Sequence, residues 1–233
     1  MRLPLAPTPL LAIALMAVVV AGLFTSEMTK VRVLRVDGVP SWDKERVGAI
    51  LRAYEGVPAL RINPLQVERQ VEWHPAVSRS DFRRNIFGRA RLAVVYRRPV
   101  AWFQRGEMEF AVSVEGAVFP LIGERPPLSV DEKLMEMRPN LSVFDSRRIG
   151  GLLDLAAKVQ QKLPSLRGKL SVLASGGLAL TVAEGARVEF GGRERLDEKV
   201  SVLARALEQS PDLLRRARTV NLVVPERPAV RWR

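Results

Sequence analysis

The distribution of apolar residues divides the chain into a short N-terminal segment and a long remainder. From Leu10 to Phe24 no residue carries a polar side chain, and the nearest charges are Arg2 and Glu27. A helix over residues 9–26 would be about 27 Å long, close to the ~30 Å hydrocarbon core of a bilayer. We therefore predict a single transmembrane anchor at residues 9–26, preceded by a short cytoplasmic tail of residues 1–8.

Two other interpretations of this segment remain open. It could be a cleaved signal peptide, with Arg2 as the charged start and a weak cleavage site at residues 19–21. It could also be a buried core helix, which the absence of a polar face disfavours. The charge count does not settle the orientation, because Lys30, Arg32 and Arg35 follow the segment. We place the C-terminal part on the extracytoplasmic side because the short charged N terminus resembles a signal anchor.

Residues 27–103 show the periodicities of a small α+β domain. Alternating apolar residues predict strands at 31–36, 77–85 and 89–97. Between the first two strands, apolar residues at helical spacing predict helices over 41–56 and 63–74. The order β-α-α-β-β predicts one sheet with two helices on the same face.

Residues 104–233 predict a second domain, a mostly antiparallel sheet with flanking helices. A hairpin is expected at 110–121, whereas residues 124–140 are polar, without a period, and are interpreted as a loop. Tight glycine turns separate three strands between residues 169 and 190, which predicts a meander. Further helices are predicted from Ser146, over 196–207 and over 211–218, and closing strands at 219–224 and 229–232.

Composition narrows the chemistry that the chain can perform. The absence of cysteine excludes disulfides, thiolate metal sites and cysteine nucleophiles. His74 is the single histidine, and it stands before a proline at a predicted helix end rather than in a catalytic or metal-binding cluster. The sequence has no phosphate-binding glycine-rich motif. We therefore predict no enzymatic activity, no metal and no cofactor.

The chain is strongly basic, with a net charge of +12 from 37 Lys and Arg against 25 Asp and Glu. Such a balance suits nucleic acid, anionic lipid or an acidic partner, or a solvated basic surface. A basic stripe along two predicted strands fits phosphate contacts and an exposed sheet face equally well. Since no nucleic-acid-binding motif accompanies it, we predict no nucleic-acid partner. The stripe consists of Arg79, Arg83, Arg84, Arg89 and Arg91.

Several short motifs resemble a known family. The strand that ends in Asp37-Gly38 and the run His74-Pro75-Ala76-Val77 resemble a POTRA domain. The signature at the end of that domain resembles the one in the FtsQ/DivIB family of bacterial cell-division proteins, although Tyr96 stands where the family usually has Glu. In this sequence the signature residues are Arg97, Pro99, Val100, Ala101 and Trp102. The resemblance implies an anchor, a POTRA domain at 27–103 and an FtsQ-type β-domain at 104–233.

The resemblance also implies a function. A member of this family would be a non-enzymatic divisome scaffold that links early and late cell-division membrane proteins and supports septal wall synthesis. It would sit in the cytoplasmic membrane at the division site, bind FtsB/FtsL-like proteins, contact other division proteins through its POTRA domain, and contact lipid through its anchor. The alternative is an exported wall-associated enzyme or a basic polymer-binding protein with a cleaved signal peptide.

The last two predicted strands are the candidate binding site. One of them should be an edge, and an edge that lacks charge invites another strand. The resembled family uses this region to hold its FtsB-like partner. The alternative is a fully paired strand with Trp232 as a core plug. The candidate partner-binding residues are Val220, Leu222, Val223, Val224, Val230, Arg231 and Trp232.

Overall fold

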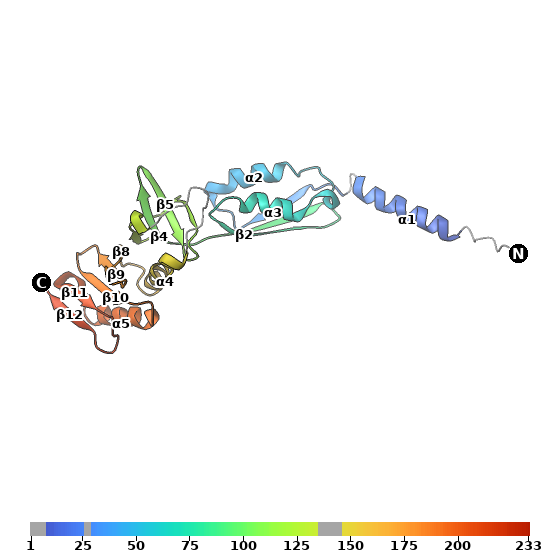
Figure 1. Cartoon of the computed structure of the whole chain (residues 1–233). Helices are drawn as coiled ribbons and strands as arrows, with labels where there is room; N and C mark the ends of the chain where they lie inside the picture. The colour runs from blue at the N-terminus through green and yellow to red at the C-terminus, as the bar shows by residue number, and fades with distance from the viewer. Residues whose placement is uncertain (1–7, 26–28, 135–145) are drawn as a thin grey trace. The chain divides into compact units, whose positions relative to one another are not determined.

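The computed structural model describes residues 8–25, 29–134 and 146–233 (Figure 1). They fall into two compact units, Met1–Tyr96 and Arg97–Arg233. Each unit contains both helices and strands, and the second contains a large sheet. The chain therefore has the mixed α+β character that the sequence predicts.

The N-terminal apolar segment forms α1 (Thr8–Thr25), a helix of 18 residues. Its backbone includes Leu10 and Phe24, the two residues that we named for the anchor, but their side chains lie outside the described part. Within residues 8–25, 29–134 and 146–233, no helix has the length and apolar character needed to cross a membrane. The predicted transmembrane anchor, and the single-pass membrane location that depends on it, are therefore wrong.

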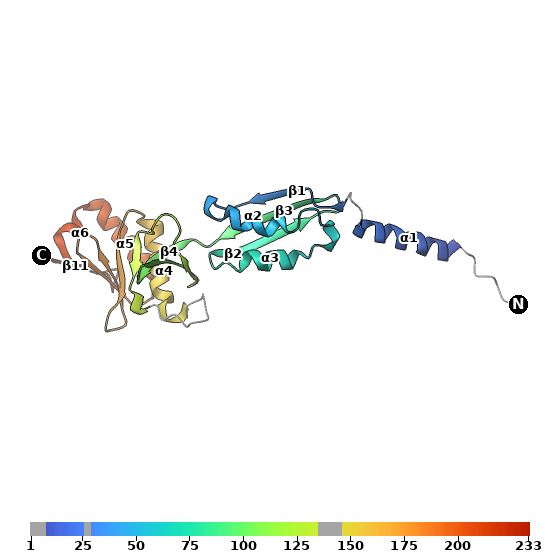
Figure 2. The same cartoon turned by 90° about the horizontal axis from the view of Figure 1, so that it is seen from above.

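The first unit contains a three-stranded sheet in the order β1-β3-β2. Strand β1 runs parallel to β3, and β2 runs antiparallel to β3. Figure 2 shows α2 and α3 lying along this sheet. The elements are β1 (Val33–Asp37), η2 (Ser41–Asp43), α2 (Lys44–Arg52), η3 (Ala59–Arg61), α3 (Pro64–Glu72), β2 (Val77–Arg84) and β3 (Arg89–Tyr96).

Local sequence explains why these helices begin where they do. The Asn63 side chain accepts a hydrogen bond from the Leu65 N–H at 3.1 Å, and Pro64 takes the first helical position of α3. By contrast, α2 begins three residues after Ser41, because residues 41–43 form a 3-10 turn. The apolar stripes of both helices pack on one face of the sheet. Their shared core includes Val47, Leu51, Val67, Val71, Phe82, Leu92 and Val94.

The second unit is built on a nine-stranded sheet in the order β12-β11-β10-β9-β8-β7-β4-β5-β6. Its helices are α4 (Ser146–Lys162), α5 (Leu196–Gln209) and α6 (Leu213–Arg216), with a 3-10 turn η4 (Glu132–Leu134). Its strands are β4 (Pro99–Arg105), β5 (Met108–Ser113), β6 (Val118–Pro120), β7 (Leu128–Val130), β8 (Gly168–Val172), β9 (Leu178–Val182), β10 (Arg187–Gly191), β11 (Ala217–Asn221) and β12 (Ala229–Trp232).

This sheet contains a strand where the sequence predicted a loop. Within residues 124–140, β7 pairs in parallel with β4 on one side and with β8 on the other. Leu128 and Val130 are buried in the core, which explains why a three-residue strand is stable here. Residues 135–140 of the predicted loop lie outside the described part. The predicted meander is present, because β8, β9 and β10 are antiparallel neighbours.

The signature residues that resemble the end of a POTRA domain lie in the second unit. Pro99, Val100, Ala101 and Trp102 belong to β4, which pairs with β5 and β7 in the large sheet. The two units meet in the sequence between Tyr96 and Arg97. Residues 97–103, which we assigned to the first domain, therefore belong to the second unit.

Candidate partner-binding edge

The large sheet ends at β12. Strand β11 lies inside the sheet, parallel to β10 on one side and antiparallel to β12 on the other. Strand β12 is hydrogen-bonded to β11 alone, so its outer side carries backbone groups without a sheet partner in the described part of the chain. Of the two C-terminal strands, β12 is thus the edge and β11 is not.

The opposite edge of the sheet is less suited to accept another strand. Strand β6 has three residues and ends in Pro120, which has no backbone N–H to donate. Strand β12 has four residues without a proline and exposes Trp232. We therefore take β12 as the candidate site in this sheet.

Two of the predicted binding residues belong to the core. The side chains of Val220 and Leu222 are 2% and 1% exposed, so a partner cannot contact them on the surface. Val230 is half-buried and packs against the same core. These three side chains anchor the end of the sheet instead of offering contact area.

The other four predicted residues are exposed. Val223, Val224 and Trp232 keep 46%, 50% and 54% of their surface, and Arg231 is also exposed. The Trp232 ring lies under the Arg216 guanidinium, whose Cζ is 5.4 Å from the ring centroid. Trp232 is therefore an exposed aromatic at the sheet edge and not a core plug.

The loop between β11 and β12 is held to the rest of the second unit. Glu226 pairs with Arg195 at 2.5 Å, and this hydrogen bond holds the pKa of the Glu226 carboxyl below its usual value. Arg195 itself adopts a left-handed backbone conformation, with φ at 56°, just before α5. The side chain of Val223 lies against Gly191, where a Cβ would come within 2.9 Å of it. Sequence analysis missed Arg195 and Glu226, because ion pairs between distant residues leave no periodic signal.

Strand register carries positive charge across the open face of the sheet to this edge. Lys169, Thr181, Arg187, Thr219 and Arg231 stand opposite one another on consecutive strands from β8 to β12. Neighbouring strands lie about 4.8 Å apart, so the three cations are spaced by about 10 Å. We call Lys169, Arg187 and Arg231 the basic row. It favours an acidic segment at the edge.

The signature residues in β4 have structural contacts of their own. Val100 and Ala101 are buried, whereas Trp102 is half-buried with the Arg125 guanidinium 5.0 Å from its ring centroid. Arg97 pairs with Glu115 at 3.6 Å. They lie in β4 and near it, while the candidate site is formed by β12 at the end of the sheet.

His74 lies in a network of partly buried polar groups in the first unit. Its Nδ1 accepts a hydrogen bond from the Ala76 N–H at 3.3 Å, and burial lowers its pKa. The nearby Asp43 carboxylate is paired with Arg46 at 2.6 Å and accepts a hydrogen bond from the Tyr96 hydroxyl. Burial raises the pKa of Tyr96 well above its usual range. Within the part of the chain that the structure describes, no three His, Asp or Glu side chains gather as metal ligands.

A comparison with known proteins identifies a similar cell-division protein. The chain is similar to the cell division protein FtsQ of Chloroflexus aurantiacus (strain ATCC 29366 / DSM 635 / J-10-fl). The two are 26% identical over 188 residues, which cover 78% of this chain and 67% of that protein. No protein-family model matches the chain. At this identity the similarity gives weak support for an FtsQ-like relationship.

Proposed function

We propose that this protein is a non-enzymatic scaffold of the bacterial cell-division machinery, and that β12 binds a partner by adding a strand to the large sheet. The observation that carries the proposal is an edge strand with free backbone groups and an exposed Trp232. The similarity to FtsQ gives the biological setting. In this proposal the partner is an FtsB/FtsL-like division protein, and the scaffold supports septal wall synthesis.

The partner segment should be extended and acidic. Its backbone would pair with β12, and its carboxylates would meet Arg231 and Arg218, which are exposed and have no ion-pair partner among the described residues. Arg218 is the extra residue of a bulge in β11, since Ala217 stands opposite Trp232 and Thr219 opposite Arg231. An exposed aromatic surrounded by arginines has the composition of an interface hot spot.

Substitution of Trp232 tests the proposed surface. We expect Trp232→Ala to weaken binding of an FtsB-like segment by about 30-fold, or ~2 kcal/mol, as interface aromatics do. The thermal midpoint should stay within a few degrees of wild type, because the side chain is already half exposed. Titration calorimetry gives the affinity, and Phe87→Ala, which removes a 76% exposed aromatic of the first unit, is the matched control.

Depletion tests the cellular role. Cells that lose the protein should grow as filaments without septa, and a Trp232→Ala copy should fail to restore division. A rod-shaped, lysing population would favour the alternative of a wall-associated enzyme. Absence of a fluorescent fusion from midcell would overturn the division role altogether.

A further inference from the structure

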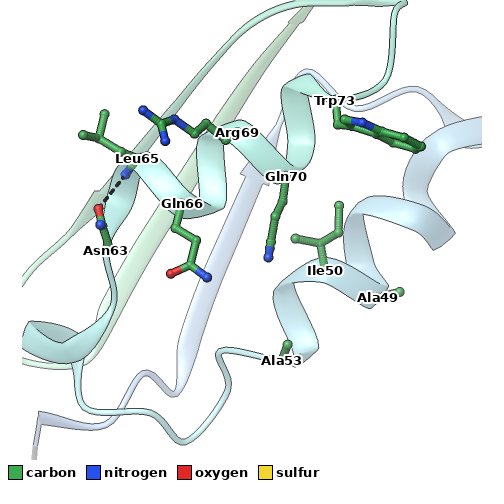
Figure 3. A pocket seen from close by; sticks show the side chains of 9 residues that line it. All are labelled: Ala49, Ile50, Ala53, Asn63, Leu65, Gln66, Arg69, Gln70 and Trp73. Carbon is green, nitrogen blue, oxygen red and sulfur yellow. Dashed lines mark hydrogen bonds between the residues drawn. The ribbon is translucent and has the colours of Figure 1, made fainter.

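An open apolar groove runs between α2 and α3 of the first unit. It encloses about 990 Å³. Figure 3 shows Ile50 of α2 and Gln70 of α3 reaching toward each other across it. The groove is lined by Ala49, Ile50, Ala53, Asn63, Leu65, Gln66, Arg69, Gln70 and Trp73.

Two large apolar side chains of this groove are exposed. Trp73 is 87% exposed and Leu65 is 61% exposed. Burying one such side chain yields about 2 kcal/mol, so a partner that covers both would gain binding energy from this surface. Leu65 and Arg69 of α3 and Trp73, which follows its last residue, are spaced four residues apart, about one helical turn. They form a continuous stripe that a second helix could cover.

The walls of the groove favour a helix over a strand as occupant. Both walls are α-helices, whose backbone groups are satisfied by their own hydrogen bonds, so no edge is available to pair with a strand. The α2 wall contributes Ala49 and Ala53, whose small side chains allow a close approach. The Tyr54 hydroxyl donates to Gln70 Oε1 at 3.0 Å and joins the two walls.

The charge of the side chains that line the groove indicates which charge an occupant should carry. Arg69 is the one charged residue that lines the groove, and it has no ion-pair partner among the described residues. The neighbouring carboxylates of α3 are turned toward β2. Glu68 accepts from the Phe82 N–H at 2.9 Å, and Glu72 accepts from the Ser80 N–H at 2.6 Å. The groove therefore presents an uncompensated positive charge beside an apolar surface.

We propose that this groove binds an amphipathic helix of a partner protein, with an apolar stripe against Leu65 and Trp73 and a carboxylate against Arg69. Helical anchors at i, i+3, i+4 and i+7 match such a groove. Walls of nine residues accommodate two to three turns of the bound helix. The inference rests on the proposed scaffold function and assigns to the first unit a contact separate from β12.

A synthetic helix tests the proposal on the full-length chain. The probe is a fluorescein-labelled peptide of about 16 residues with leucines at i, i+3, i+4 and i+7 and flanking glutamates. Companion peptides replace Glu by Lys or scramble the order. Fluorescence anisotropy should show the Glu peptide binding about tenfold more tightly than either companion. Trp73→Ala should weaken it by about tenfold, and Arg69→Glu should reverse the preference between Glu and Lys peptides.

Control variants separate the groove from the rest of the first unit. Phe87 is 76% exposed in the turn between β2 and β3, and Arg89 is exposed on β3. Phe87→Ala and Arg89→Glu should therefore leave peptide binding unchanged. Circular dichroism melting should show the same midpoint for all four variants, since every substituted side chain is exposed.

Several outcomes would overturn the inference. Equal binding of the scrambled peptide, or binding unaffected by both Trp73→Ala and Arg69→Glu, would exclude an amphipathic helix. Trp73-dependent binding to phosphatidylglycerol vesicles, without peptide binding, would assign the groove to lipid. A dimer in sedimentation that Trp73→Ala dissociates would assign it to a second copy. Trp232→Ala should not alter peptide binding, so loss of the β12 interaction and loss of the groove interaction are separate results.

Discussion

The open faces of the two sheets both carry rows of basic side chains. The two rows differ in how many of these side chains are paired with carboxylates. In the first unit, Arg35, Arg91 and Arg83 stand opposite one another on β1, β3 and β2. Each has a carboxylate nearby: Asp37 pairs with Arg35 at 3.2 Å and with Arg91 at 2.6 Å, and Asp81 pairs with Arg83 at 2.9 Å.

In the second unit only the first cation of the basic row is paired. Lys169 lies 3.0 Å from Asp131, whereas Arg187 and Arg231 have no ion-pair partner among the described residues. A row of cations therefore indicates a binding surface only where the protein leaves out the counter-charges. By this criterion the row formed by Arg35, Arg91 and Arg83 carries its own counter-charges, whereas the edge of the second sheet attracts an acidic partner.

The largest expected effect concerns the division between core and surface at the end of the second sheet. Leu222→Ala should lower the free energy of unfolding by about 3 kcal/mol, because it opens a cavity at a side chain that is 1% exposed. Val224→Ala, two residues away and half exposed, should change it by less than about 0.5 kcal/mol. Urea titrations followed by circular dichroism give both values. A stable Leu222→Ala protein that no longer binds its partner would show that Leu222 belongs to the binding interface and not to the core.

The second effect in size concerns the Asp43 carboxylate of the first unit and its contribution to stability. Burial pushes the pKa of Asp43 up, but hydrogen bonds from Arg46 and Tyr96 outweigh it and leave that pKa below the ordinary 3.8. The carboxylate therefore stabilises the fold above about pH 4, and this stabilisation is lost as the pH falls through the lowered pKa.

Asp43→Asn should accordingly lower the stability at pH 7 by about 2 kcal/mol, since Arg46 and Tyr96 lose a charged acceptor. It should also flatten the dependence of stability on pH below about pH 4. Asp81→Asn, which removes an exposed carboxylate, is the matched comparison. Equal pH profiles for Asp43→Asn and wild type would show that the buried pair contributes no linkage.

The smallest expected effect compares the two sheets directly. Arg231→Glu should weaken binding of an acidic partner segment by about fivefold, or ~1 kcal/mol, and reduce the dependence of the affinity on salt. Arg91→Glu makes the same charge change in the first sheet and should leave the affinity unchanged. Titration calorimetry at two salt concentrations gives both results. Equal losses for both variants would mean that net charge, and not the edge, attracts the partner.

Sequence patterns predicted the elements whose signals are local. Asn63 and Pro64 set the start of α3 through a side-chain cap and a fixed φ, and alternating residues identified β2 and β3. Strand β7 was not predicted, because three residues are too few to show a period and its stability comes from pairing with neighbouring strands. The apolar run at residues 9–26 was over-interpreted as an anchor, since no helix of the described residues has the length and apolar character needed to cross a membrane.

The sequence by itself determined most of the helices and strands, the absence of cysteine chemistry and the strong positive charge, because these depend on composition and on neighbours within a few positions. Only the tertiary structure decided that β11 lies inside the sheet and β12 at its edge, that Val220 and Leu222 are core while Trp232 is exposed, and that β4 joins the second unit. It also decided which arginines are neutralised. These features depend on pairing between residues far apart in the chain, and strand order and counter-charges leave no periodic trace in the sequence.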